Sequence, residues 1–509
     1  MKQMKTWMSA AILTICSTSV IAQDVQYQEY LQSNEYPNAL RFMPLPPTFD
    51  SIRYADDLIQ WEWGKTQRDT PRGQQASREE LRTPDIMRIV IAEALSIDTI
   101  SDTTTPALAR LLQRAYYTGN ACVKGQKKQY FRIRPFMQMG EDTWGAYDDD
   151  FLRTNSSFPS GHTAFGWFTA MVFAEMFPQL QDTIMRRGFQ FGENRVISGA
   201  HYQSDVYTGY LSAAASFARA HANPELREDI LAARAEYISL KGYPADYNVM
   251  DGVDIPHGEN ILNMPVTADS YRFVGDLMRY WQARNLRTTE RGEQARCDAP
   301  YTIENIEGTM GDVMEMEISE TATPAIHALM AYVLEKSSNT ADHMKPLRFR
   351  TRPFVQLGDN TLFPDDEEKE KGKSSYPSGH TCLGWSEALT LIEVAPELQD
   401  TILHRGFQFG ESRQIAGYHW ASDIEAGRLL ASTLMTYLHN DATFLDLLAK
   451  ARTEYQAKTT GIAPVASRQA TNAEGTYTLG GLRLSGKPSG KGIYISNGSK
   501  YLNTGNTRP

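Results

Sequence analysis

Apolar residues recur at three- and four-residue steps along three long segments of the chain, residues 107–117, 163–177 and 205–222. This spacing places the apolar side chains on one face of an α-helix, so we expect each segment to be helical. Alternating apolar and polar positions, which are typical of strands, are scarce up to about residue 457. The pattern therefore predicts an all-α fold whose helices are stable because they bury their apolar faces against one another.

The chain also repeats itself. The segment Ser157–Thr163, with the sequence Ser-Phe-Pro-Ser-Gly-His-Thr, returns 218 positions later as Ser375–Thr381, with Tyr in place of Phe. Nearer the N-terminus, Arg72–Ala76 matches Arg291–Ala295 at an offset of 219. A repeat of this length indicates a duplicated domain. We expect two tandem helical-bundle domains, joined by a linker rich in Gly, Pro, Asp and Asn, with the bounds 44–240, 241–262 and 263–457.

The first residues have the pattern of a secretory signal peptide. Lys2 and Lys5 precede a mostly apolar stretch, and Val20-Ile-Ala22 offers a small-residue cleavage site. We therefore expect residues 1–22 to be removed and the protein to be exported. No later stretch has 18 consecutive apolar residues, so the mature chain is expected to have no integral membrane segment.

The last segment, residues 458–509, differs in composition from the rest. It contains short β-prone runs around the turn-forming pair Asn497-Gly498, which predicts a short β-rich or flexible tail. The tail loosely resembles C-terminal segments that direct some exported bacterial proteins to the cell surface. We expect a periplasmic protein, or a secreted or cell-surface one if the tail is a sorting segment.

Composition narrows the classes of function. A hydrophobic content of 41% and a charged content of 22% are typical of a soluble globular protein. The net charge of −10 argues against general nucleic-acid binding, so an anionic substrate must be attracted by local cations. Behind the signal peptide only Cys122, Cys297 and Cys382 remain, which permits at most one intrachain disulfide.

The repeated Pro-Ser-Gly-His sequence is the first candidate for chemistry. It precedes an apolar run in both halves and therefore predicts a helix start. Glycine allows a ligand to approach the backbone, and the unpaired N–H groups of a helix N-terminus suit an anion. His162 and His380 would then exchange a proton with the bound group. The alternative is an ordinary helix cap with an incidental histidine.

The second candidate is a pair of cations, Lys127 and Arg134, which returns as Lys345 and Arg352. Positions i and i+7 share one face of a helix, so we expect each pair to project from the same side, with the following proline at the helix boundary. Two cations, one of them able to bond two oxygens at once, suit a phosphate group. The alternative is a solvated basic face.

The third candidate combines an arginine with a histidine and an aspartate. It comprises Arg195, His201 and Asp205, and again Arg413, His419 and Asp423. His and Asp four positions apart can meet on a helical face, where the carboxylate fixes the tautomer and leaves the other ring nitrogen free as a base or nucleophile. The alternative is a pair that only stabilises the helix.

One further histidine pair, His221 and His439, recurs in both halves. His221 follows His201 by 20 positions, which corresponds to about 30 Å of helix. This distance excludes the pair from the same site. A position near a helix C-terminus, where a cation is favoured, is the better interpretation.

Along the chain the cation pair comes first, then Pro-Ser-Gly-His, and then the arginine with its histidine and aspartate. In this chain order, the three motifs resemble the signature of the phosphatidic-acid-phosphatase type 2 superfamily, which also includes vanadium haloperoxidases. Their flanks resemble the soluble bacterial class A nonspecific acid phosphatases, in Arg132-Ile-Arg-Pro-Phe136, Gly410-Glu-Ser-Arg413 and His419-Trp-Ala-Ser-Asp423. The resemblance covers both halves and implies the helical-bundle fold of this superfamily, present twice. The second copy follows the pattern more closely, because the first has Asn194 where the second has Ser412.

This resemblance implies an exported, metal-independent acid phosphatase that hydrolyses small phosphate monoesters through a phosphohistidine. His201 and His419 would be the nucleophiles, oriented by Asp205 and Asp423, and His162 and His380 would be the proton donors. No cofactor and no metal are implied, and we expect both sites to be active. The phosphate-binding residues would be Lys127, Arg134, Ser160, Gly161, Arg195, Lys345, Arg352, Ser378, Gly379 and Arg413.

Three other functions remain open at this point: a vanadium-dependent haloperoxidase, a lipid phosphate phosphatase on the same fold, and a phosphate-binding protein without activity. Because class A relatives are commonly oligomeric, we also expect the two halves to pack as an intrachain pseudo-dimer.

Overall fold

The computed structural model describes residues 28–145 and 149–460, together with four short strands in the C-terminal tail. The predicted signal peptide lies outside the described residues. The chain divides into two units, one ending at Arg452 and one beginning at Thr453. The first repeat, and the second repeat up to Arg452, belong to the first unit. The bounds predicted for two separate domains stay a prediction.

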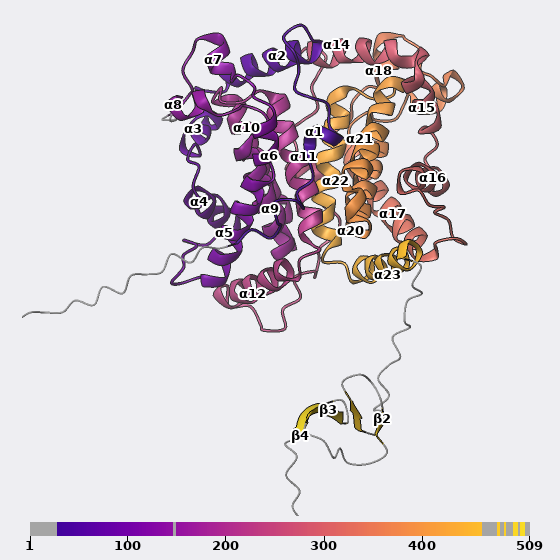
Figure 1. Cartoon of the computed structure of the whole chain (residues 1–509). Helices are drawn as coiled ribbons and strands as arrows, with labels where there is room; N and C mark the ends of the chain where they lie inside the picture. The colour runs from indigo at the N-terminus through magenta and orange to yellow at the C-terminus, as the bar shows by residue number, and fades with distance from the viewer. Residues whose placement is uncertain are drawn as a thin grey trace, which may run out of the picture. The chain divides into compact units, whose positions relative to one another are not determined.

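The first repeat is built from helices, as the apolar pattern predicts. The three predicted helices correspond to α5, α9 and α11 (Figure 1). The elements of this half are α1 (Ala39–Phe42), α2 (Ile52–Thr66), α3 (Pro71–Arg78), α4 (Pro84–Leu95), α5 (Pro106–Ala121), α6 (Lys124–Gln129), α7 (Pro135–Met139), α8 (Asp149–Thr154), α9 (Gly161–Met176), the 3₁₀ helix η1 (Pro178–Leu180), α10 (Gln181–Ile197), α11 (Gln203–Ala220) and α12 (Pro224–Leu240).

The second repeat has closely similar elements, preceded by a one-turn helix in the linker, α13 (Gly258–Ile261). They are α14 (Phe273–Arg284), η2 (Asn285–Thr288), α15 (Glu290–Cys297), α16 (Ile303–Met314), α17 (Pro324–Leu347), α18 (Pro353–Leu357), η3 (Pro364–Asp366), α19 (Glu367–Glu370), α20 (Gly379–Val394), η4 (Pro396–Leu398), α21 (Gln399–Ala416), α22 (Ala421–Leu438) and α23 (Ala442–Thr460).

Each half has a central helix that begins at the Pro-Ser-Gly-His motif. All 16 residues of α9 are buried, because the helix is apolar on every side and other helices surround it. The Ser160 side chain accepts a hydrogen bond from the backbone N–H of Thr163 and so caps the helix. Ser378 caps α20 in the same way through Thr381. The motif therefore lies at the N-terminus of a helix fixed in the core.

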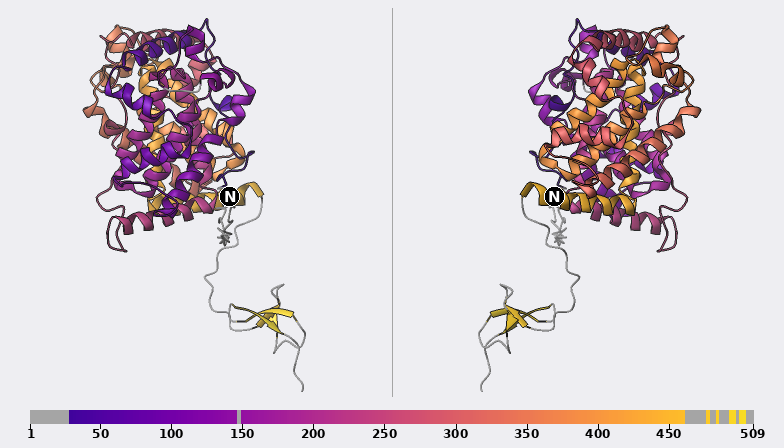
Figure 2. Two further views of the ribbon diagram at one scale, coloured as in Figure 1. Left: turned by 90° about the vertical axis from the view of Figure 1, so that its left-hand side faces the viewer. Right: turned by 90° about the vertical axis from the view of Figure 1, so that its right-hand side faces the viewer.

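The two halves share an extensive contact. Helix α11 of the first half packs against α20 and α22 of the second, and α2 packs against α14 (Figure 1). The two views in Figure 2 show the first half mainly from one side and the second half mainly from the other. Gly275 permits the close approach of α2 and α14, since a Cβ at this position would lie 2.1 Å from the Asp56 carboxylate.

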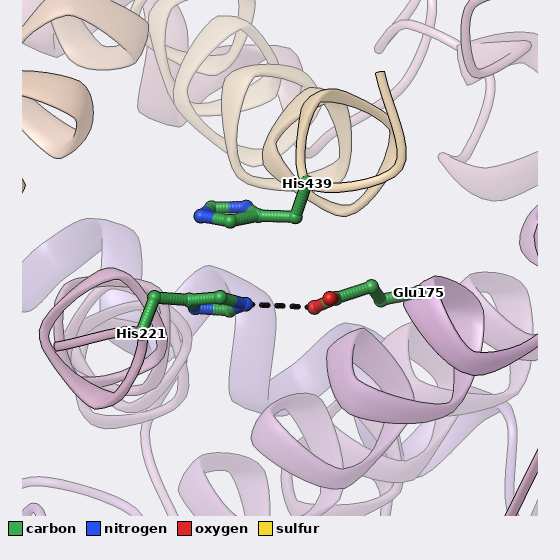
Figure 3. A group of neighbouring side chains, drawn as sticks. All are labelled: Glu175, His221 and His439. Carbon is green, nitrogen blue, oxygen red and sulfur yellow. Dashed lines mark hydrogen bonds and ion pairs between the residues drawn. The ribbon is translucent and has the colours of Figure 1, made fainter. Parts of the chain in front are cut away.

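His221 and His439 lie at this contact between the halves. They are the C-caps of α11 and α22, as predicted, and their rings stack with centroids 3.5 Å apart (Figure 3). His221 Nε2 lies 2.8 Å from the buried carboxylate of Glu175, and His439 Nε2 lies 3.0 Å from that of Glu393. We name these four residues the interface cluster. They place two carboxylates and two imidazoles where the halves meet.

The unit beginning at Thr453 contains the four described strands, β1 (Thr476–Thr478), β2 (Arg483–Leu484), β3 (Gly492–Ser496) and β4 (Ser499–Asn503). They pair antiparallel in the order β2-β1-β3-β4. The rest of the tail lies outside the described residues, so the character of the whole segment stays a prediction. Among the residues that the structure describes, no helix combines the length and apolar character needed to cross a membrane.

The interface cluster makes stability depend on pH in a defined way. Burial alone would lower the pKa of His439, but the carboxylates of Glu393 and Glu175 outweigh burial and raise this pKa above its ordinary 6.5. This contribution to stability is present below pH 6.5 and is lost as the pH rises through the raised value. The imidazoles in turn lower the pKa values of Glu175 and Glu393 below 4.5, so their contribution is lost as the pH falls through those values.

We expect the double substitution Glu393→Gln/His439→Gln to remove much of this dependence. The difference in the free energy of unfolding between the wild type and the variant should be largest between about pH 5 and 6.5 and should shrink by about 1 kcal/mol on either side. Urea unfolding followed by circular dichroism from pH 3 to 9 measures it, with His404→Gln as the control. A difference that stays constant with pH would contradict this account.

Candidate active site

The predicted residues of the second half surround one cavity of about 780 Å³. Ser378 and Asp423 do not line it and are fully buried. Six of the residues named from the sequence contribute to its wall: Lys345, Arg352, Gly379, His380, Arg413 and His419. We name this cavity the second site, and the equivalent residues of the first half the first site. Segments far apart in the sequence thus bring cations and histidines into one cavity.

The expectation that Lys127 and Arg134 project from one helix is wrong. Helix α6 ends at Gln129, and Arg134 has extended backbone angles at the N-cap of α7. The reason is Pro135, which begins α7 and excludes helical geometry at the residue before it. In the second half, Arg352 is likewise the N-cap of α18, after α17 has ended at Leu347.

Each arginine of this motif reaches the histidine of the third motif. Arg134 Nη1 lies 3.0 Å from His201 Nε2 and donates to the carbonyl of Ala200 at 2.8 Å. Arg352 Nη1 lies 3.3 Å from His419 Nε2 and 3.0 Å from the carbonyl of Tyr418. A guanidinium can only donate, so Nε2 of each histidine is in its unprotonated form.

The second ring nitrogen supports this assignment in the second half. His419 Nδ1 lies 2.7 Å from the backbone carbonyl of Ser375, and a carbonyl can only accept. Nδ1 therefore carries the proton, and Nε2 presents a lone pair beside the Arg352 guanidinium. A neutral histidine with a free Nε2 is a nucleophile that a nearby cation can assist.

The expectation that His and Asp meet on a helical face is also wrong in its reasoning. Helix α11 begins at Gln203, after His201, and Asp205 accepts the backbone N–H of Tyr202 at 2.9 Å, as a cap does. The pair is nevertheless close, with 3.6 Å between His201 Nδ1 and Asp205 Oδ2 and 3.8 Å in the second half. At these distances the attraction is electrostatic and there is no direct hydrogen bond.

Two further groups hold the aspartate, and the sequence reasoning gave neither of them a role. Arg132 donates to Asp205 at 2.6 Å and to Asp57 of α2 at 2.7 Å, and Ser157 donates to Asp205 at 2.5 Å. Burial alone would raise the pKa of Asp205, but the charge of Arg132 outweighs burial and lowers this pKa. In the second half, Arg350 donates in the same way to Asp423 and to Asp276 of α14, and Ser375 donates to Asp423. Their recurrence at the repeat offset was the signal that could have identified them.

The histidines of the Pro-Ser-Gly-His motifs follow the first residue of the central helices. His162 Nε2 lies 2.9 Å from the carbonyl of Glu80, and His380 Nε2 lies 2.9 Å from that of Ala299. Because a carbonyl only accepts, Nε2 carries a proton and Nδ1 is left to exchange one. Burial, and then the nearby Arg195 and Arg413, lower the pKa values of His162 and His380 well below 6.5.

The nucleophile candidates have lowered pKa values for the same reasons. Burial comes first, followed by Arg134 for His201 and by Arg352 and Arg413 for His419. Burial, and then the charge of Arg134, also lower the pKa of Lys127 well below 10.5. An empty site therefore disfavours further positive charge, and a bound anion would reverse this effect.

The remaining cations differ in their contacts. Arg195 donates to the carbonyl of Glu79 at 3.0 Å, and Lys345 lies 2.7 Å from Asp342. Within the described part of the chain, Nε and Nη1 of the buried Arg413 have no hydrogen-bond partner. Burial, and then the neighbouring Arg352, lower the pKa of Arg413 to about 10. These unpaired N–H groups border the second site and are suited to the oxygens of an anion.

A cation lies close to the glycine at the helix start. A Cβ placed on Gly379 would lie 3.5 Å from Lys345 Nζ, so this ammonium lies directly at the N-terminus of α20.

Groups of His and Glu that could share a metal ion do occur in the described residues, namely Glu175 with His221 and His439, and Glu259 with His257 and His343. Neither group contains a predicted site residue.

Comparison with known proteins agrees with this geometry. A family model described as the PAP2 superfamily matches twice, at residues 110–227 and 324–444. A non-specific acid phosphatase of Providencia stuartii is 39% identical over 196 residues, which are 38% of this chain and 79% of that protein. One of Salmonella typhimurium is 35% identical, over 37% of this chain and 75% of that protein.

An acid phosphatase of Zymomonas mobilis is 32% identical over 41% of this chain and 80% of its own length. Each relative is therefore matched over most of its length by less than half of this chain, as a tandem duplication requires. The chain belongs to the PAP2 superfamily, carries its domain twice in succession, and is related to the bacterial non-specific acid phosphatases.

Proposed function

We propose that the protein is a phosphoric monoester hydrolase, an acid phosphatase with two active sites that hydrolyses small phosphate monoesters. The second site carries this proposal, because Arg352, Arg413 and His419 meet there in one cavity whose arginine N–H groups are partly unpaired. The relatives named as acid phosphatases support the same activity. Dependence on a bound metal is not part of the proposal, since the five Lys and Arg side chains in the cavity wall outnumber its three carboxylates and disfavour a metal cation.

In the proposed reaction, Nε2 of His201 or His419 attacks phosphorus. The N–P bond forms as the P–O bond to the leaving group breaks. His162 or His380, which takes up a proton at Nδ1 when the anion binds, gives this proton to the leaving oxygen. The same histidine then takes a proton from water, whose oxygen attacks phosphorus, breaks the N–P bond and releases inorganic phosphate. Asp205 and Asp423 stabilise the positive charge that develops on the attacking imidazole.

The phosphoryl oxygens are held by cations and by a helix end. Lys127, Arg134 and Arg195, and their equivalents Lys345, Arg352 and Arg413, neutralise the charge of the phosphoryl group in the transition state. Gly161 and Gly379 are the first residues of helices of 16 residues. Their backbone N–H groups lie at helix N-termini, which favour an anion. Ser160 and Ser378 take part as the caps of these helices.

We further propose that the two halves form an intrachain pseudo-dimer. The contacts of α11 with α20 and α22, and the interface cluster, support this arrangement. The pattern of residues 1–22 supports export of the protein to the periplasm. If the tail is a sorting segment, the destination is the cell surface.

Single and double nucleophile variants test the proposed activity. With p-nitrophenyl phosphate in the presence of EDTA, His201→Ala and His419→Ala should each keep the activity of the other site. The double variant should lose at least about 10³-fold in kcat/KM, because nothing else forms the intermediate. His343→Ala, outside both sites, is the matched control. Full activity of the double variant would exclude the mechanism, and loss in one single variant would identify one inactive site.

Ligand binding should be coupled to proton uptake. Since burial and the arginines lower the pKa values of His162, His201 and Lys127, an entering phosphate raises these values and draws protons from the solvent. Phosphate should therefore bind more tightly as the pH falls from 7 to 5. Calorimetry in buffers of different ionisation enthalpy measures the uptake, which should decrease in the His162→Ala/His380→Ala variant. Proton release on binding would contradict the assignment.

A further inference from the structure

The second site contains a carboxylate as well as cations. Glu370, the last residue of α19, lies 3.1 Å from Arg352 Nη2 and 2.7 Å from Lys373 Nζ, and it lines the cavity. The Glu370 side chain is 21% exposed and that of Arg352 is 5% exposed, so the ion pair is shielded from most of the solvent. The nucleophile's arginine partner is thus bonded to an acidic side chain.

This carboxylate occupies a bonding position that a phosphoryl oxygen would use. The Arg352 guanidinium that it contacts also lies 3.3 Å from His419 Nε2. Carboxylate and phosphoryl oxygens accept the same N–H groups of arginine, with similar geometry. A phosphate placed for attack by His419 and bonded to Arg352 through Nη2 therefore competes with Glu370.

The position of Glu370 is fixed by its own helix. Glu367, at the start of α19, accepts hydrogen bonds from the backbone N–H of Thr361 at 2.6 Å and from its hydroxyl at 3.0 Å. This anchor holds the one-turn helix at the edge of the cavity, with Glu370 at its end. The contact with Arg352 is therefore built into the fold.

The repeat provides a comparison within the same molecule. At the offset of 218, the residue of the first half that corresponds to Glu370 is Leu152. The Leu152 side chain is buried and packs with Phe136 and Ala200, while its backbone carbonyl accepts from Arg134 Nε at 3.0 Å. Arg134 Nη2 donates to the neutral oxygens of Asn155 and Ser156, whereas Arg352 Nη2 contacts the Glu370 carboxylate. The two halves therefore share the predicted motifs and differ in a residue at the phosphate-binding arginine.

We propose that Glu370 is a specificity-determining residue of the second site, which competes with the substrate phosphate for Arg352 and makes the two sites unequal. The second site then binds phosphate more weakly than the first and works at higher substrate concentration. This inference rests on the proposed phosphatase function. It predicts a change in substrate and phosphate affinity, with a smaller change in kcat.

Other charged groups determine when the competitor is ionised. Burial raises the pKa of Glu370, but Lys373, Arg352 and Lys369 outweigh it and hold the pKa below its ordinary 4.5. The carboxylate is therefore charged throughout the weakly acidic range and loses its charge only below it. The other charged or titratable groups that face the cavity are Tyr301, Asp342, Lys345, Asp366, His380, Arg413, Tyr418 and His419.

Substitution of Glu370 in a chain with only the second site active tests the proposal. In the His201→Ala background, Glu370→Gln and Glu370→Leu should lower the inhibition constant for inorganic phosphate and KM by about tenfold. Phosphate then forms its charge-assisted bond to Arg352 without first displacing the Glu370 carboxylate. The effect should shrink as the pH falls below 4.5. Glu368→Gln, on the same helix but paired with Lys371, is the matched control and should change neither constant.

The converse background separates this inference from the proposed function. In the His419→Ala background, which leaves the first site, Glu370→Leu should have no effect on KM. Titration of the otherwise unaltered chain with inorganic phosphate should show two classes of site, of which Glu370→Leu tightens only the weaker one. Two equal sites, or an inhibition constant unchanged or raised in both Glu370 variants, would overturn the inference. Absence of both hydrolysis and phosphate binding in the wild type would instead refute the proposed function.

Discussion

The buried ion pair between Asp205 and Arg132, and its equivalent between Asp423 and Arg350, is the interaction on which each site depends. A buried carboxylate is costly unless it is paired and hydrogen-bonded, and these two bonds are 2.6 Å long. The same aspartate caps α11 or α22 and lies beside the histidine that precedes the helix. Arg132 also bonds to Asp57 of α2, so one charge network joins the nucleophile's turn to two helices.

Duplication explains both the similarity of the sites and their difference. The central helices, their serine caps and the charge networks are the same in both halves, since they determine the fold of each bundle. Residues that border the substrate position differ, as Leu152 and Glu370 do. A similar exchange occurs where Arg82 bonds to Asn120 in the first half and Tyr301 packs on His380 in the second. The two halves thus share a scaffold and differ in residues beside the predicted phosphate-binding groups.

The sequence was sufficient for three long helices of the first half and for six residues that meet in the second site. Periodic apolar positions identified α5, α9 and α11, and the order of the motifs identified the six cavity residues. The predicted local geometry was wrong at Arg134 and His201, where the spacing alone suggested a continuous helix. Pro135 begins α7 directly after Arg134, and the helix capped by Asp205, α11, begins only after His201. Contacts between distant segments, such as Arg132 with Asp57 and Glu370 with Arg352, do not follow from spacing, because only the tertiary fold brings these segments together.

The central claim is that His201 and His419 each carry the phosphoryl group during turnover. The most direct measurement is a rapid quench with a radiolabelled phosphate monoester, followed by peptide mapping under alkaline conditions, which preserve phosphohistidine. The account predicts label on two peptides, one containing His201 and the other His419, and no label on either after substitution by alanine. Label on a serine or aspartate, or turnover without a labelled intermediate, would contradict it.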